Sequence, residues 1–125
     1  MRLKIFDVET LNKMFYYLDY NVDTQEFVDF EISHRKNDLD KMVKYLVDRD
    51  FDYLVGFNSL NFDSQVITYI TESSPNWANL KGDEIALKIA EFASKTIDDT
   101  NHGLRPRYWE NDLVCPTIEI GRAHV

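Results

Sequence analysis

The sequence predicts a single α/β domain in which a mixed sheet is flanked by helices. Three observations support this: an alternating strand near the amino terminus, two β-rich runs after it, and amphipathic helices interleaved with further strands. With 125 residues, 44% of them hydrophobic, the chain can form one core. It contains no apolar run of membrane-spanning length and no signal-peptide pattern. We therefore expect a cytoplasmic protein with no membrane partner.

The first half predicts an antiparallel trio of strands and then a crossover. The first strand begins at Leu3, and a hairpin follows with strands at 14–20 and 26–32. Asn37 can cap a helix that extends to Val47, since apolar residues recur there with helical period. This helix leads into a short buried strand at 53–57, from which point the sheet is expected to be parallel.

The second half predicts two helices and a last strand. One helix begins at Asp63 and ends at 73–75, and an amphipathic helix follows from Asp83 to about Ile97. A last strand is expected at 111–115. The polar stretch before it carries Arg105 and Arg107, which could bind phosphate, although exposed loop arginines are more often simply solvated.

Three carboxylates are expected at one edge of this sheet. Asp7 and Glu9 share a face of the first strand, about 6.5–7 Å apart along the backbone. We expect this to be the inward face of a central strand, where a divalent metal would offset the cost of two carboxylates. Asp63 follows strand 53–57, and adjacent parallel strands end at the same edge. From Asp-x-Glu alone, a strand that runs out into solvent is the simpler interpretation.

These residues resemble the DEDD superfamily of 3′–5′ exonucleases, which have a ribonuclease H-like fold. Phe6-Asp7-Val8-Glu9-Thr10 is similar to the first exonuclease motif, and Asn58-x-x-x-Phe62-Asp63 is similar to the second. The run from Gly56 to Asp63 is most similar to proofreading domains of family B DNA polymerases and to related phage exonucleases. The motifs occur in the family order, roughly fifty residues apart, and the resemblance extends to about Thr117.

The resemblance implies a metal-dependent hydrolase that removes nucleoside monophosphates from DNA 3′ ends, with two Mg²⁺ or Mn²⁺ ions as cofactors. It implies that Asp7 bridges both ions, Glu9 holds the ion that activates water, and Asp63 holds the ion at the leaving group. The substrate contacts that it implies are Thr10, Leu11, Asn58 and Phe62. For Asn58, a structural role in bracing the turn is an equally good interpretation. For Phe62, burial of the ring under the helix is the favoured interpretation.

The expected partner is a single-stranded or frayed DNA 3′ end, together with a DNA polymerase in the same chain or as a subunit. The setting would be replication or proofreading in a bacterium or a phage-infected cell. The net charge of −8 disfavours binding by phosphate neutralisation alone, but metal ions would supply local positive charge. The alternative is a non-catalytic ribonuclease H-like module that binds nucleic acid or protein.

The resemblance also implies a fourth carboxylate on a later helix and a tyrosine or histidine that orients water. We find no such helix after Thr117. Ile120 to Val125 is the translation of ATC GGA AGA GCA CAC GTC, which is similar to a sequencing-library adapter. We therefore expect a partial exonuclease domain at 1–119, an adapter-encoded tail at 120–125, and little or no activity. The sequence leaves open whether DNA or RNA is the substrate.

Overall fold

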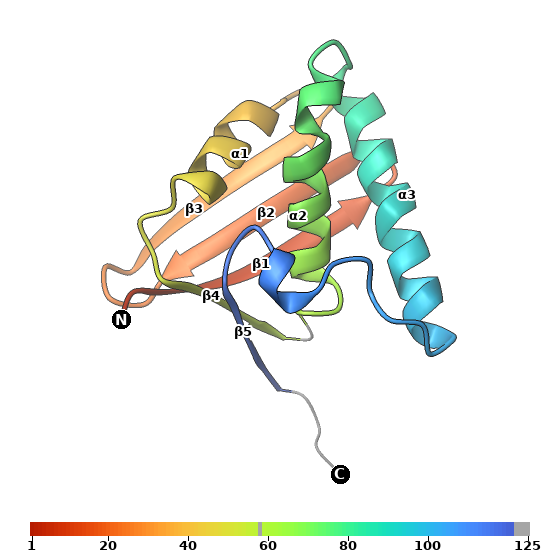
Figure 1. The fold of residues 1–125 in the computed structure, drawn as a ribbon. Helices are drawn as coiled ribbons and strands as arrows, with labels where there is room; N and C mark the ends of the chain where they lie inside the picture. Colours follow the sequence, from red (N-terminus) through yellow and green to blue (C-terminus); the bar gives the residue numbers. More distant parts are fainter. Residues whose placement is uncertain (58, 122–125) are drawn as a thin grey trace.

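The computed structural model describes residues 1–57 and 59–121. Among these residues five strands form one sheet in the order β3-β2-β1-β4-β5, with β1 (Leu3–Leu11) in the middle (Figure 1). β2 (Met14–Asn21) and β3 (Glu26–Ser33) continue from β1 as an antiparallel meander. β4 (Tyr53–Phe57) pairs parallel with β1, and β5 (Thr117–Ile120) pairs parallel with β4. The predicted α/β class and mixed sheet are confirmed.

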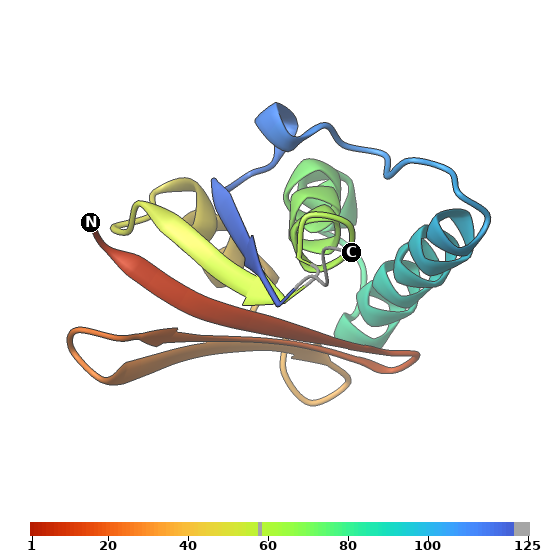
Figure 2. The ribbon, with the colours of Figure 1, turned by 90° about the horizontal axis from the view of Figure 1, so that it is seen from below.

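The three α-helices of the described residues lie on one side of this sheet (Figure 2). α1 (Leu39–Val47) packs against β3, whereas α3 (Gly82–Asn101) packs across β1, β2 and β3. α2 (Asp63–Ser73) follows β4 and lies beside α3, and two short 3-10 turns, η1 (Ser74–Trp77) and η2 (Glu110–Asp112), interrupt the connections. In the part of the chain that the structure describes, no helix is both long enough and apolar enough to span a membrane.

The β2–β3 hairpin has a turn that its sequence specifies. The Asn21 side-chain oxygen accepts hydrogen bonds from the backbone N–H groups of Asp23 and Thr24. Gln25 takes a left-handed conformation with φ of 62° and donates its N–H to the Asn21 carbonyl. Because an asparagine side chain can replace a backbone acceptor in this way, the polar stretch after Asn21 closes a hairpin.

α1 is tied to β3 by reciprocal hydrogen bonds. Asp38 accepts the Glu31 N–H on its side chain at 3.0 Å and donates its own N–H to the Glu31 carbonyl at 2.9 Å. The Asn37 side chain accepts the N–H of Leu39 at 3.1 Å, which satisfies one of the free donors at the start of the helix. The predicted N-cap is one residue early: Asp38 occupies the N-cap position, and Asn37 bonds the helix from the position before it.

The core lies between the helices and the side of the sheet that faces them. α3 approaches β3 so closely that a Cβ on Gly82 would lie 1.9 Å from the Ser33 carbonyl oxygen, so only glycine fits there. The largest fully buried hydrophobic side chains come from strands and helices alike: Tyr17, Phe15, Ile32, Met42, Leu46, Leu54, Ile67, Ile70, Ile85, Ile89 and Val66.

Two predictions about strands are wrong. Residues 111–115 form no strand; η2 and a bend occupy them, and β5 comes later, at Thr117–Ile120, beginning after Pro116, which has no N–H for a ladder. The face of β1 that carries Ile5, Asp7 and Glu9 is also not the inward one, since these residues are exposed while the alternate positions are buried. Phe6 and Val8 are the β1 side chains that join the core, and they leave the alternate face to solvent.

Candidate functional site

β1 and β4 pair over a short distance and then separate. Their register matches Leu3 with Tyr53 and Ile5 with Val55, and the described pairing stops there, although β1 continues to Leu11. The chain leaves β4 after Phe57 and enters α2 at Asp63. The strand-to-helix junction predicted at this position is confirmed, and it lies beside the part of β1 that has no β4 partner.

Asp63 interacts with both of the carboxylates on β1, Asp7 and Glu9. Its side chain is only 6% exposed, and it shares a hydrogen bond with the carboxyl group of Asp7. Burial, the charge of Asp7 and that hydrogen bond, and then the charge of Glu9, raise the pKa of Asp63 to about 7. Asp63 therefore keeps its proton to a higher pH than an ordinary aspartic acid, and in that form it can share the proton with Asp7.

The three carboxylates differ in their surroundings. Asp7 and Glu9 are exposed on the face of β1 away from the helices, whereas Asp63 is buried in the first turn of α2. Residues 1–57 and 59–121 contain no group of three or more His, Cys, Asp or Glu side chains that are arranged around a common metal position. The arrangement is therefore a hydrogen-bonded pair, Asp7 and Asp63, with Glu9 near enough to act on it electrostatically.

The donor set has the chemistry that a hard divalent cation requires. Carboxylate oxygens are the ligands preferred by Mg²⁺ and Mn²⁺. A cation that replaced the shared proton would remove the repulsion that now raises the pKa of Asp63. The residues suit such an ion by the type of their donor atoms, although they are not arranged around a common metal position in the described part of the chain.

The other predicted site residues do not all lie on the same face as the carboxylates of β1. Leu11 is 55% exposed on the same face of β1 as the carboxylates, whereas Thr10 is half-buried on the opposite face. Phe62 caps α2 and packs against the core, as the burial interpretation requires. Asn58 lies outside the described residues.

One polar contact surface was not predicted. The side chains of Gln65, Thr68 and Glu72 share one face of α2, and each bonds the segment before β5. Gln65 donates to the Tyr108 carbonyl and accepts from the Tyr108 N–H, both at 2.9 Å. The sequence signal was present: three polar residues at i, i+3 and i+7 of a helix predicted to be buried.

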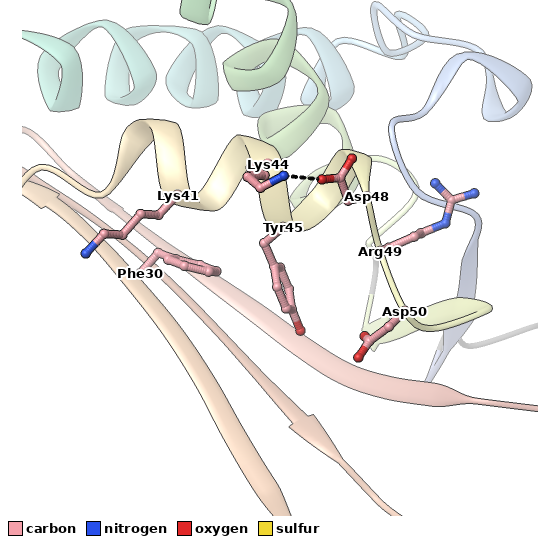
Figure 3. Close-up of a pocket in the computed structure, with 7 residues that line it drawn as sticks. All are labelled: Phe30, Lys41, Lys44, Tyr45, Asp48, Arg49 and Asp50. Atoms are coloured by element: carbon pink, nitrogen blue, oxygen red, sulfur yellow. Dashed lines mark hydrogen bonds and ion pairs between the residues drawn. The ribbon is translucent and has the colours of Figure 1, made fainter.

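A separate cavity of about 400 Å³ lies beneath α1 and contains none of the predicted site residues (Figure 3). Lys41 and Arg49 point away from each other, and Lys44 is paired with Asp48 at 2.6 Å. The Tyr45 hydroxyl is already bonded to Asp19 inside the protein. These side chains do not converge on one ligand position, so the cavity is weaker than the carboxylate pair as a candidate site.

Comparison of the chain with protein-family models, curated proteins and solved structures found no match in any of the three.

Proposed function

We propose that this chain is a ribonuclease H-like domain of a metal-dependent 3′–5′ exonuclease that acts on DNA ends. The observation that carries the proposal is Asp63, a buried carboxyl group whose pKa is raised to about 7 by burial and then by Asp7 and Glu9. Like charges placed next to a buried carboxyl group are destabilising in themselves. They are expected where a protein has to hold a cation.

The topology supports the same proposal. A middle strand carries Asp7 and Glu9, an antiparallel hairpin extends the sheet on one side, and parallel strands extend it on the other. This arrangement is compatible with a ribonuclease H-like fold. The two motifs that resemble exonuclease motifs are separated in sequence, and the effect of Asp7 on the pKa of Asp63 supports the proposal that they act together.

Asp7, Glu9 and Asp63 would hold the ions in this proposal. When bound, divalent ions would act as Lewis acids on the phosphoryl group and stabilise the leaving oxygen. The position of Asp63 in the first turn of α2 favours its ionised form, because the helix N-terminus carries partial positive charge. Deprotonation of Asp63 is the step that the protein itself has to complete before metal can bind.

Metal-dependent stabilisation tests the proposal. We expect Mg²⁺ or Mn²⁺ to stabilise the chain against thermal unfolding, by about 2.7 kcal/mol at a free concentration about 100 times the Kd. Asp7→Asn should abolish this gain because it removes a ligand. Asp23→Asn is the control, since it removes the same charge from the exposed β2–β3 turn.

The outcomes separate the proposal from the alternative function. No stabilisation of the wild-type chain by either ion would favour a non-catalytic binding module and contradict the metal proposal. Nuclease activity is a less direct test, because the family that the sequence resembles also uses a fourth carboxylate. We expect little hydrolysis from the 125-residue chain even where metal binds.

A further inference from the structure

The segment between α3 and β5 is fixed against the start of α2 (Figure 1). Gln65, which is fully buried, bonds both the backbone N–H and the backbone carbonyl of Tyr108, and Thr68 accepts the Val114 N–H at 3.0 Å. Because Gln65 is in the same turn of α2 as Asp63, this anchoring gives the segment a defined position relative to the carboxylates.

A small cleft lies between this segment and the loop that leads into α2. Leu60 and Asn61 line one side, and Arg105 and Trp109 line the other, with Pro106, Tyr108 and Glu110 completing the wall. Its volume is about 180 Å³. Pockets for drug-sized ligands are larger, roughly 300–1,000 Å³, so the cleft suits one planar group.

Arg105 and Trp109 form a stacked pair at this cleft. The Arg105 guanidinium carbon lies 3.6 Å from the centroid of the Trp109 ring, and Trp109 is 61% exposed. Neither Arg105 nor Arg107 forms an ion pair with any residue in the ranges 1–57 and 59–121. The cleft therefore combines an accessible aromatic surface with one guanidinium group, that of Arg105, which has no ion-pair partner among the described residues.

These features match a single-stranded nucleic acid better than a protein or a small metabolite. An exposed aromatic ring stacks on any base, and a neighbouring arginine can donate to the adjoining phosphate. In a chain with net charge −8, a strand of DNA needs such local positive charge to approach at all. Glu110 is the one carboxylate among the residues that line the cleft.

We propose that this cleft holds one nucleotide of a single-stranded DNA whose end lies at the carboxylates. The base stacks on Trp109, and Arg105 donates to a phosphate beside it. This inference rests on the proposed exonuclease function, because it assigns the cleft to the same substrate. Asn61 and Leu60 then contact the strand from the loop that connects the cleft with Asp63.

The test is binding of a fluorescein-labelled oligothymidylate to the 125-residue chain in EDTA, measured by anisotropy. We expect Trp109→Ala to weaken binding about 5- to 150-fold, the range for loss of one stacked base. Trp109→Phe should retain most of the affinity but lose the quenching of tryptophan fluorescence, since Trp77 is buried. Lys88→Ala is the charge control for Arg105→Ala, because Lys88 is exposed on α3.

Each outcome decides one proposal separately. Equal binding by wild type, Trp109→Ala and Arg105→Ala would overturn the assignment of the cleft, as would absence of binding by the wild type. The proposed metal function would stand in either case if Mn²⁺ still stabilised the chain. Conversely, tight binding that depends on Trp109, without any effect of Mn²⁺, would support the cleft and contradict the metal site.

Discussion

Replacement of Asp63 by asparagine should stabilise this protein in the absence of metal, and more so at alkaline pH. The amide keeps the size of the carboxyl group and can donate a hydrogen bond to Asp7, as the protonated carboxyl group does. It cannot ionise, so the repulsion from Asp7 and Glu9 that raises the pKa of Asp63 is removed.

The size of the effect follows from the pKa of Asp63, which is raised from 3.8 to about 7 in the folded chain. Between these values the folded state holds a proton that the unfolded state has lost, so stability falls as pH rises and the loss is complete above pH 7. Each pH unit in this window corresponds to about 1.4 kcal/mol. Between pH 5 and pH 8 the wild type should therefore lose about 3 kcal/mol through this group, and Asp63→Asn should not.

Urea unfolding in EDTA at pH 5 and pH 8 measures this difference directly. Comparing the two proteins at each pH cancels the titrating groups that do not interact with Asp63, because those groups behave alike in both proteins. If the free energy of unfolding of the wild type changed with pH in parallel with that of Asp63→Asn, the account of the carboxyl cluster would be refuted. Addition of Mn²⁺ at pH 8 should then stabilise the wild type and leave the variant unchanged.

Three further substitutions test contacts that hold the fold together, each by urea unfolding. Gln65→Leu should lower the free energy of unfolding by about 1–3 kcal/mol, because the backbone N–H and carbonyl of Tyr108 both lose their hydrogen-bond partner. An unchanged midpoint would contradict the anchoring of this segment by Gln65. Gly82→Ala should cost about 1–3 kcal/mol, because the added methyl group overlaps the Ser33 carbonyl, whereas Ser94→Ala on the exposed side of the same helix should be nearly neutral. Tyr45→Phe should cost about 1–3 kcal/mol, because it removes the hydroxyl that donates to the buried Asp19 at 2.6 Å, and no loss would show that this bond is dispensable.

Much of the fold could be predicted because local patterns agree with the tertiary structure. Alternation in β1, the Asn21 turn and the helical period after Asn37 each specify an element without long-range information. The last strand could not be placed, because residues 111–115 are apolar enough for a strand and only pairing with β4 selects Thr117–Ile120 instead.

The site was partly predictable for a similar reason. The spacing of Asp7 and Glu9 and the junction at Asp63 were visible in the sequence, and the structure places these groups near one another. The inward or outward direction of the Asp7 face could not be decided, because both faces of β1 contain apolar residues. The Trp109 cleft depends on anchoring by Gln65 from a distant part of the chain, which local patterns do not show.

The most direct test of the carboxyl cluster is calorimetric titration of the chain with Mn²⁺ at pH 6, in two buffers of different ionisation heat. If Asp7, Glu9 and Asp63 hold the ion, binding should displace the proton shared by Asp7 and Asp63, so close to one proton should be released per binding event. Asp63→Asn should release none. Saturable binding without proton release at this pH, or binding that is unchanged in Asp63→Asn, would contradict the assignment of the metal to these three carboxylates.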